Sequence, residues 1–366
     1  MRILYLAQNI PVPGTHGGST HVTEVVRALR QLGHDVLLVA RRGSSGEGVV
    51  PIGLGSPGGV LRHAIPYLLF RKTLAHARAF HPDAIYERYS NFGLGILLGR
   101  ALKVPVVSMI LDDKASGITL TGADCLITTA PELVPARHRD RVVEVSWGAN
   151  TELFHPGVDG AATRAEHGLA DDDFVVGYTG AFYKWHGLHH VVQAASLLAE
   201  EPDAAKLRYL LVGGGDRLPH IERLVAKSPV AERFVMVGRV PYADVPRHVA
   251  ACDACVAPYS PADHGQFKER FFFDPLKVFE YMAAGRPTIT LDAENMRRLF
   301  EDGRHALLVE PGSPQAIADA ILRLLREPAL RERLSSEGRA IVGERFSWLA
   351  HGRQLTEIFE ELVSSR

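Results

Sequence analysis

Cysteine is scarce in this sequence, and long apolar segments are absent. The 366 residues include 3 cysteines, Cys125, Cys252 and Cys255. Three cysteines cannot form a disulfide framework in a chain of this length, so a reducing, cytoplasmic location is expected. No apolar run approaches the ~20 residues that a transmembrane helix needs. The apolar start, Met1–Ala7, is short and indicates a buried strand rather than a signal peptide.

An excess of either charge is also lacking. The formal net charge is −1 at pH 7, with 41 Lys and Arg residues against 42 Asp and Glu residues. Nucleic acid is therefore not expected as the main partner, because there is no basic excess to neutralise phosphates. The composition leaves a peripheral contact with a membrane open. It is otherwise that of a globular protein, and the length suggests two domains.

Patterns typical of metal or redox sites are missing as well. Asp112-Asp113 is not an Asp-x-Asp motif, and a single acidic pair seldom holds a cation. The 17 histidines form no His-Glu-x-x-His motif, and the adjacent His189 and His190 are expected to point in different directions from a helix. Cys252-x-x-Cys255 has no second pair, which favours two buried structural cysteines. We therefore expect neither a metal ion nor a cofactor.

Strand and helix patterns alternate along the chain in two series. The first opens with a strand at Arg2–Ala7, followed by apolar residues at helical spacing from Val22 to Leu32 and a second strand at Val36–Ala40. This order is typical of a parallel α/β sheet. The further strands expected in this series are 84–86, 104–108, 125–128 and 142–145.

Small and polar residues at 155–172 separate the two series and are interpreted as a linker. The strands expected in the second series are 174–178, 209–212, 234–237, 254–258, 288–291 and 306–309. The sequence thus predicts an α/β protein with two doubly wound sheets, whose ligands bind at strand C-terminal ends facing a cleft. The expected domains are 1–155 and 156–346. A final helix, within about 347–366, is expected to cross back to the first domain.

Glycines mark three segments that a ligand could approach. Gly17-Gly18 precedes a helix, where free N–H groups favour a phosphate, although a plain turn capped by Ser19 fits equally well. Gly53-x-Gly55-x-x-Gly58 matches a dinucleotide fingerprint, but it contains Pro57 and no helix follows, so we interpret it as a loop. Gly213-Gly-Gly215 follows a strand, and either a sharp turn or a ligand approach fits it.

Two helix starts carry potential cations. Lys184 and His186 stand just before a helical pattern at 188–200, which favours an anion site over an aromatic loop packed at the domain edge. Pro275 and Gly285 bracket a short helix on which Lys277 and Glu280 share one face. A surface Lys–Glu pair is the plain alternative. However, Lys277 in the first turn opposes the helix dipole, and a nearby phosphate would explain its position.

These motifs, in this order and over essentially the whole chain, resemble the retaining glycosyltransferases of family four, which have the GT-B fold. The resemblance rests on Gly17–Val36, Tyr86-Glu-Arg88-Tyr-Ser, Trp147–Pro156, Gly180–Gly187, Val237-Gly-Arg239-Val-Pro241, Lys277–Pro287 and Phe346-Ser-Trp348. Many members carry a second glutamate where this chain has Phe272. The chain instead resembles a variant with Pro-Leu-Lys before the glutamate helix.

The resemblance implies roles for individual residues. Glu280 resembles the glutamate that accepts hydrogen bonds from the donor ribose, and Gly17-Gly18 resembles the loop that contacts the donor diphosphate. The segment from Val237 to Pro241 resembles the stretch that meets the base. The full set of candidates is Lys277, Lys184 and His186 as catalytic residues, Gly17, Gly18, Glu280, Asp274, Val237 and Arg239 for the donor, and Arg88 and His16 on the acceptor side.

The implied activity is metal-independent transfer of a sugar, with retention, from a nucleotide-sugar donor to the hydroxyl of a glycan, lipid-linked or secondary-metabolite acceptor. Such transfer needs preorganised groups that stabilise the charge on the departing diphosphate. Two alternatives stay open: a sugar-nucleotide epimerase on the same fold, and a non-catalytic nucleotide-sugar-binding protein. A nicotinamide-dependent oxidoreductase is more distant, because the fingerprint glycines are misplaced.

Overall fold

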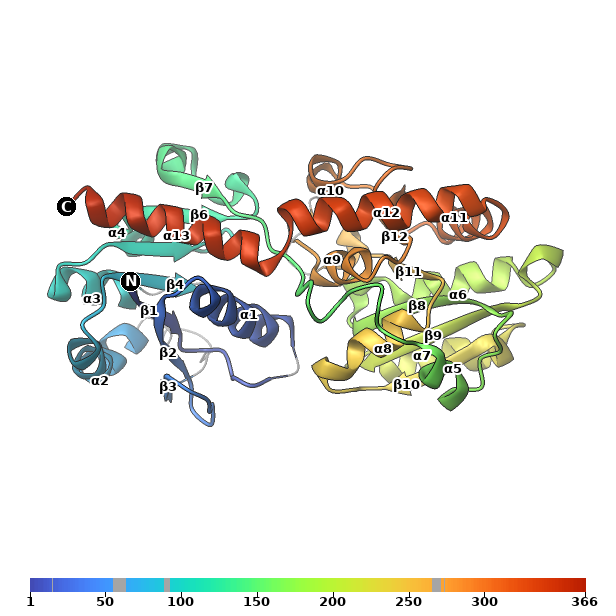
Figure 1. The fold of residues 1–366 in the computed structure, drawn as a ribbon, viewed down its shortest axis with the longest axis horizontal. Helices are drawn as coiled ribbons and strands as arrows, with labels where there is room; N and C mark the ends of the chain where they lie inside the picture. Colours follow the sequence, from blue (N-terminus) through green and yellow to red (C-terminus); the bar gives the residue numbers. More distant parts are fainter. Residues whose placement is uncertain (15, 55–63, 89–92, 265–270, 273) are drawn as a thin grey trace. The chain divides into compact units, whose positions relative to one another are not determined.

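The protein divides into two compact units (Figure 1). Unit 1 comprises Met1–Trp147 and Trp348–Arg366, and unit 2 comprises Gly148–Ser347. The sequence had suggested a boundary at residues 155–156. The structure, a computed structural model, describes residues 1–14, 16–54, 64–88, 93–264, 271–272 and 274–366.

Unit 1 is built on a parallel sheet in which the described residues form seven strands, in the order β3-β2-β1-β4-β5-β6-β7. The strands are β1 (Arg2–Ala7), β2 (Asp35–Arg41), β3 (Val49–Gly53), β4 (Ala84–Arg88), β5 (Val106–Met109), β6 (Cys125–Thr128) and β7 (Val142–Glu144). The helices are α1 (Gly17–Gln31), α2 (Ile65–Phe80), α3 (Leu94–Leu102), α4 (Gly117–Gly122) and α13 (Trp348–Ser364), with 3₁₀ turns at Pro131–Leu133 and Ala136–Arg141.

Unit 2 repeats the design with six parallel strands in its described part, in the order β10-β9-β8-β11-β12-β13. The strands are β8 (Phe174–Ala181), β9 (Leu207–Gly214), β10 (Phe234–Gly238), β11 (Ala254–Ala257), β12 (Thr288–Leu291) and β13 (Leu307–Val309). The helices are α5 (Ala161–Glu166), α6 (Leu188–Leu197), α7 (Leu218–Ala226), α8 (Val245–Ala250), α9 (Leu276–Ala283), α10 (Glu294–Leu299), α11 (Pro314–Arg326) and α12 (Pro328–Arg345). Short 3₁₀ turns lie at Lys184–His186, Pro202–Ala204, Ala231–Arg233, Tyr242–Asp244 and Pro261–Asp263.

Both sheets confirm the prediction of doubly wound α/β units. In each, the chain runs outward from a central strand and then returns to the other side of that strand. The order of strands therefore reverses between β1 and β4 in unit 1, and between β8 and β11 in unit 2. Open sheets of this kind bind ligands beside the carboxyl ends of the strands at the reversal point. The two reversal points are therefore the expected positions of a ligand site.

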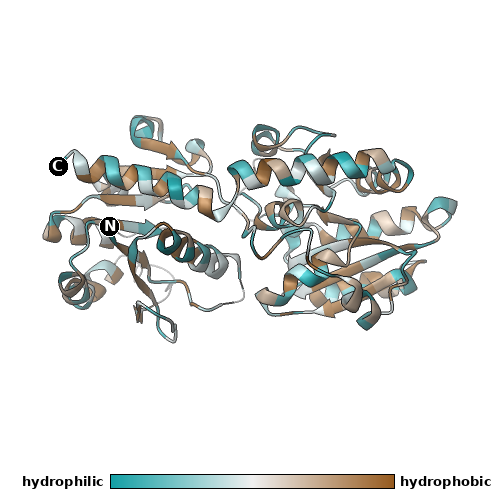
Figure 2. Ribbon diagram, viewed as in Figure 1, coloured by the Kyte–Doolittle hydropathy of each residue, from teal (hydrophilic) through white to brown (hydrophobic). Residues whose placement is uncertain are grey.

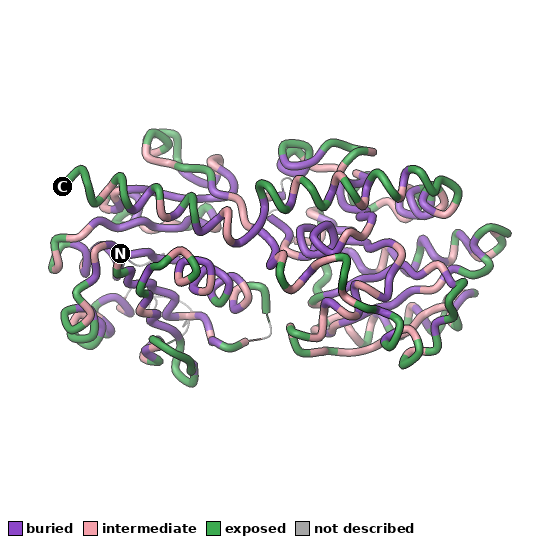
Figure 3. Tube along the Cα trace, in the orientation of Figure 1, coloured by how far each residue is buried: buried purple, intermediate pink, exposed green. Residues whose placement is uncertain are grey.

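The strands form the apolar centre of each unit. Figures 2 and 3 show hydrophobic, buried strands and helices with one buried side. In β1, every residue from Ile3 to Ala7 has no exposed surface, as expected for a parallel strand covered on both faces. Apolar residues of β8, β9, α6 and α11 form one continuous core in unit 2.

The final helix belongs to unit 1, as the sequence predicted. A Cβ at Gly352 of α13 would lie 3.1 Å from Ala28 of α1, so the two helices pack closely. Nε2 of His34 is 2.8 Å from Oγ1 of Thr356. Nδ1 of His351 donates a hydrogen bond to the carbonyl of Ser146 at 2.9 Å.

Residues 155–172 differ from the linker that was expected. They contain α5, whose Arg164 donates hydrogen bonds to the carbonyl of Ala251 at 2.9 Å and to Oδ2 of Asp253 at 2.6 Å. A Cβ at Gly160 would lie 2.4 Å from the backbone of Ala250. This segment is therefore an integral part of unit 2.

None of the described helices combines the length and apolar character that a bilayer crossing requires.

Candidate functional site

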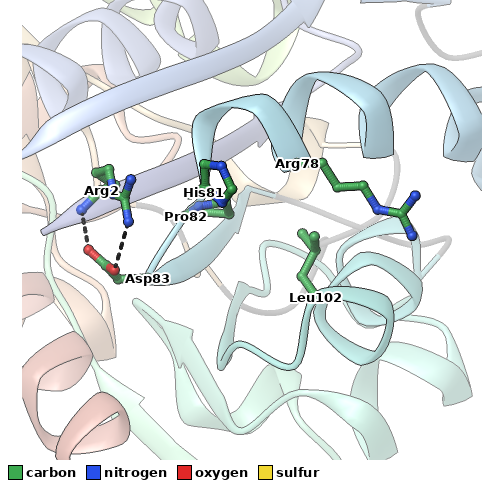
Figure 4. A pocket seen from close by; sticks show the side chains of 6 residues that line it. All are labelled: Arg2, Arg78, His81, Pro82, Asp83 and Leu102. Atoms are coloured by element: carbon green, nitrogen blue, oxygen red, sulfur yellow. Dashed lines mark hydrogen bonds and ion pairs between the residues drawn. The ribbon is translucent and has the colours of Figure 1, made fainter.

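One surface pocket of unit 1 lies away from the reversal point of its sheet. A cavity of about 380 Å³ is lined by Arg2, Arg78, His81, Pro82, Asp83 and Leu102 (Figure 4). The backbone N–H of Arg2 donates to Oδ2 of Asp83 at 2.6 Å. Arg2 begins β1 and Asp83 directly precedes β4. The cavity therefore lies at the amino ends of the strands, opposite the edge where ligands of such sheets bind.

Lys277 lies at the reversal point of the unit 2 sheet. It projects from the first turn of α9 against Tyr178 of β8 and Tyr259, which follows β11. Its Nζ donates to the phenolic oxygen of Tyr178 at 2.9 Å and lies 4.1 Å from the centroid of that ring. The Tyr259 ring centroid is 5.1 Å away. A Cβ at Gly180, where φ is +129°, would be 3.0 Å from Nζ, so any larger residue there would displace the amine slightly.

The amine of Lys277 is buried, with 7% of the residue exposed. Burial lowers its pKa to about 7, and the negative charge of Glu280 opposes this shift. The plain alternative of a surface Lys–Glu pair is therefore excluded. The tyrosine rings offset part of the cost of removing the Lys277 ammonium from water. Its pKa is nevertheless lowered, so the positive charge is only partly stabilised in the free protein. An anion bound beside Lys277 would raise this pKa again.

Glu280 stands one helical turn further along α9 and is also buried, with 8% exposed. The hydroxyl of Tyr242 donates to Oε1 of Glu280 at 3.2 Å. The ring of Phe154 packs against Tyr242, with 5.8 Å between centroids. The carboxylate is thus held in one orientation on the same helix as the buried amine.

His186 differs from the expected cation. Its Nδ1 donates to the carbonyl of Ala181 at 2.6 Å, and the side chain is buried. Burial lowers the pKa of His186 well below its usual value, and the neighbouring charge of Lys277 lowers it further. The imidazole is therefore neutral near pH 7, because burial disfavours its charged form and a positive Lys277 nearby disfavours it further.

Lys184 is exposed and forms an ion pair with Asp263, with 2.6 Å between Nζ and Oδ1. Asp274 is buried directly before α9. Arg239 is exposed just after β10, and its Nε would lie 3.3 Å from a Cβ at Gly214. Val237 is half-buried within β10. Asp274 thus adjoins the helix that bears Lys277, whereas Arg239 and Val237 belong to the outer part of the sheet.

The three glycines at 213–215 allow the backbone to pack closely against the end of β8. A Cβ at Gly213, where φ is +140°, would lie 1.8 Å from the carbonyl oxygen of Gly180. A Cβ at Gly215 would lie 2.8 Å from the carbonyl oxygen of Phe182. The ends of β8 and β9 therefore touch, which favours the turn interpretation over ligand approach.

In unit 1, the start of α1 follows the carboxyl end of β1. His16 is the N-cap residue, and its Nδ1 accepts a hydrogen bond from the N–H of Ser19 at 3.3 Å. Gly17 opens the helix, and a Cβ at Gly18 would meet the His16 ring at 3.1 Å. The first turn contains no acidic residue. These features suit the anion-binding role expected of the loop.

Two arginines lie at the same carboxyl end of the unit 1 sheet and add positive charge there. Arg41 ends β2 and Arg88 ends β4. Burial lowers the pKa of His16, and the charges of Arg88 and Arg41 lower it further, so both lie near this histidine. Nε of Arg88 donates to Nδ1 of the buried His21 at 3.3 Å. Sequence reasoning missed Arg41, although its place at the end of a strand beside the reversal point could have indicated it.

The other residues considered in the sequence either have structural roles or lie outside the described residues. The three cysteines are free and buried, and Sγ of Cys252 donates to the carbonyl of His248 at 3.1 Å. This confirms the interpretation of Cys252 and Cys255 as buried structural cysteines. Oδ1 of Asp112 accepts from the N–H of Lys114 at 2.9 Å. Gly55, Gly58, Tyr89 and Ser90 lie outside the described residues.

The interpretation of His189 and His190 was wrong. The two rings lie together, with 3.8 Å between their centroids and 43° between their planes. Both residues belong to the first turn of α6, where Nδ1 of His190 turns toward Oε1 of Gln193 at 3.2 Å. Their side chains therefore share one side of the helix start.

Comparisons with known families agree with the division into two units. Residues 15–110, within unit 1, match the sequence model described as Glycosyltransferase Family 4, and residues 173–327, within unit 2, match that described as Glycosyl transferases group 1. Each unit carries a glycosyltransferase domain. The resemblance noted in the sequence is confirmed at this level.

Two relatives are similar over part of their length. The chain is 26% identical over 286 residues to "Alpha-D-kanosaminyltransferase" of Streptomyces kanamyceticus, covering 77% of this chain and 67% of the relative. It is 28% identical over 256 residues to "D-inositol 3-phosphate glycosyltransferase" of Corynebacterium glutamicum strain R, covering 66% of this chain and 58% of that protein. The match thus spans little more than half of the second relative.

Solved structures share the fold. Sucrose-phosphate synthase from Thermosynechococcus elongatus superposes with a TM-score of 0.76 at 22% identity, over 100% of both chains. Anabaena HepE in complex with UDP superposes with a TM-score of 0.77 at 20% identity, over 99% of this chain and 100% of HepE. The two Rossmann-like units of this chain therefore have the GT-B fold.

Proposed function

We propose that the protein is a retaining glycosyltransferase that moves a sugar from a nucleoside diphosphate donor to an acceptor hydroxyl without a metal ion. The observation that carries this proposal is the buried Lys277 at the reversal point of the unit 2 sheet, one turn before Glu280. Retention is proposed from the family 4 match and the motifs that resemble that family. HepE, a structural neighbour, binds UDP, which makes a UDP-sugar the first donor to test.

Lys277 is assigned to the donor diphosphate. A buried amine with a pKa of about 7 gains a proton when an anion approaches, because the opposite charge favours the ammonium form. As the bond to the sugar breaks, negative charge grows on the leaving diphosphate, and the ammonium stabilises it more strongly than in the ground state. This preorganised charge replaces the divalent cation that other transferases use.

Glu280 is assigned to the donor ribose. Its carboxylate, oriented by Tyr242, accepts hydrogen bonds from the ribose hydroxyls. Hydrogen bonds to a charged acceptor are each worth about 1.5–3 kcal/mol, enough to select a nucleotide over inorganic diphosphate. Asp274, Val237 and Arg239 remain proposed donor contacts. Neutral His186 is assigned to hydrogen bonding and Lys184 to attraction of the anionic donor.

The unit 1 residues are assigned separately. The start of α1, with Gly17 and Gly18, offers N–H groups to an anion, and Arg41 and Arg88 add positive charge beside it. His16 and Arg88 are proposed on the acceptor side. The three buried, free cysteines accord with a reducing compartment, so the proposal includes action in the cytoplasm.

The first test is a thermal stabilisation screen with a panel of nucleotide-sugars. A donor at 100 times its Kd stabilises the native state by about 2.7 kcal/mol, which gives a clear rise in melting temperature. We expect at least one nucleoside diphosphate sugar to stabilise the protein and to do so less in Lys277→Met. Absence of stabilisation by every donor would contradict the proposal. Turnover of the binding donor then distinguishes transfer from epimerisation, which exchanges the proton at the epimerised carbon, and from binding alone.

A further inference from the structure

Three side chains that can bind metal ions lie together in unit 2, apart from the Lys277–Glu280 pair. His189 and His190 belong to the first turn of α6, and Asp263 ends a 3₁₀ turn. One donor atom from each lies within 4.8 Å of the other two, and Nε2 of His189 is 3.6 Å from Oδ2 of Asp263. No other group of three histidine, cysteine or acidic side chains with this spacing occurs among the described residues.

The spacing suits a small ion after a modest adjustment. Three atoms separated by up to 4.8 Å always leave a point within about 2.8 Å of all three. Zinc binds imidazole nitrogen and carboxylate oxygen at about 2.0–2.2 Å, so each donor atom needs to move by less than about 1 Å. Rotation about side-chain torsions supplies such a shift without moving α6. All three residues are half-buried, which leaves room for a water ligand.

Nε2 of His190 is available to bind a metal ion. Its Nδ1 lies 3.2 Å from Oε1 of Gln193, an oxygen that only accepts, so this nitrogen carries the proton. Nε2 then bears the lone pair, and this buried atom has no hydrogen-bond partner in the described part of the chain. Metal-binding histidines are commonly held in this way, with the other ring nitrogen donating to an oxygen.

We propose that His189, His190 and Asp263 bind one transition-metal ion, zinc by ligand type, with water completing the coordination. Two imidazoles and a carboxylate form a donor set that Zn²⁺ accepts in tetrahedral geometry. The ion takes no part in the bond-breaking step of the proposed sugar transfer, which rests on Lys277. The site therefore adds a binding function whose link to the proposed activity runs only through Lys184, the lysine assigned to attraction of the donor.

Lys184 competes with the ion. Its Nζ lies 2.6 Å from Oδ1 of Asp263, so its positive charge opposes a cation bound at the other oxygen. Removing this charge is expected to tighten metal binding several-fold. The reverse also holds, because a bound ion weakens the Lys184–Asp263 pair and frees the lysine.

Binding is tested on the full-length protein without a histidine tag, by calorimetric titration with zinc chloride and by competition with a chromophoric chelator. We expect one equivalent of Zn²⁺ to bind, with affinity lowered more than tenfold in His189→Ala and in Asp263→Asn. Lys184→Ala is expected to bind more tightly than the wild type. His76→Ala, which removes an exposed helical histidine of unit 1, serves as the matched control and should bind like the wild type.

The proposal is overturned if the protein takes up no stoichiometric Zn²⁺, or if His189→Ala and Asp263→Asn bind as tightly as His76→Ala. Melting temperatures measured in EDTA identify a variant that fails to fold. His189→Ala and Asp263→Asn each remove a different ligand, so one of the two that folds is enough to test the site. The assay contains no nucleotide-sugar. Failure of metal binding therefore leaves the transferase proposal intact, and failure of transfer leaves the metal site intact.

Discussion

Nζ of Lys277 lies 2.9 Å from the phenolic oxygen of Tyr178 and 4.1 Å from the centre of its ring. The tyrosine hydroxyl is itself fixed, because it donates to the carbonyl of Ala181 at 2.7 Å. Its lone pair is thereby directed at the amine. One aromatic side chain of β8 thus holds the lysine of α9 at the carboxyl end of the sheet, where the proposed diphosphate would bind.

Replacement of Lys277 by methionine is expected to lower kcat more than tenfold. Loss of one transition-state contact of at least ~1.4 kcal/mol corresponds to that factor. The melting temperature without ligand should not fall, because methionine fills similar space and needs no desolvation of an amine. Steady-state kinetics and thermal unfolding check both effects. Lys227→Met, at an exposed lysine of unit 2, is the control. Normal turnover in Lys277→Met would make the lysine structural.

Nucleoside diphosphate affinity is expected to fall as pH rises above 7. The free protein loses the Lys277 proton around pH 7, whereas a bound diphosphate favours the ammonium and raises its pKa. Binding above pH 7 therefore requires proton uptake, and Kd should rise roughly fifteenfold between pH 7 and pH 8.5.

Isothermal titration at several pH values measures this dependence. Lys277→Arg keeps its charge throughout and should show a flat profile over the same range. An equally flat profile in the wild type would mean that Lys277 is not coupled to the diphosphate.

Glu280→Gln is expected to weaken binding of nucleoside and nucleoside diphosphate by the same factor. Its proposed partners, the ribose hydroxyls, are present in both ligands, and hydrogen bonds to a charged acceptor are worth about 1.5–3 kcal/mol. Tyr242→Phe removes only the hydrogen bond that orients Oε1 and should cost about 1 kcal/mol. Lys277→Met should spare the nucleoside. If Glu280→Gln affects the diphosphate alone, the ribose assignment is wrong.

Gly213→Ala is expected to destabilise the protein by more than about 3 kcal/mol, since its Cβ would lie 1.8 Å from a backbone oxygen at positive φ. Gly343→Ala is the matched control, because a Cβ there meets nothing within 4 Å in helix α12. Gly343→Ala should raise the free energy of unfolding by about 0.5–1 kcal/mol, because alanine favours a helix more than glycine does. Denaturant unfolding compares the two. Equal effects would mean that the contact between the ends of β8 and β9 is not tight.

Most strands could be predicted from the sequence because parallel strands buried on both faces are short apolar runs, as in Arg2–Ala7. Strand β3 was missed, since Val49–Gly53 lies at the sheet edge and contains Pro51. Helix α12 was missed because its buried side is narrow. One residue per turn faces inward there: Leu330, Leu334, Gly338 and Val342.

The candidate site was only partly predictable. Helical spacing placed Lys277 and Glu280 on one face of α9. The burial of Lys277, however, depends on Tyr178 of β8 and on Tyr259, which follows β11. The pKa shifts of Lys277 and His186 follow from that packing and could not be derived from sequence. The approach of Asp263 to His189 likewise depends on how a loop after β11 meets α6.

The central claim is tested most directly by incubating the protein in EDTA with the nucleoside diphosphate sugar that stabilises it, using water as the acceptor. We expect slow release of nucleoside diphosphate and free sugar, with the anomeric configuration of the donor seen by NMR in the first product. The rate should be unchanged by EDTA and at least tenfold lower in Lys277→Met. Release that stops in EDTA and returns with Mn²⁺ or Mg²⁺, or a product of inverted configuration, would contradict the account.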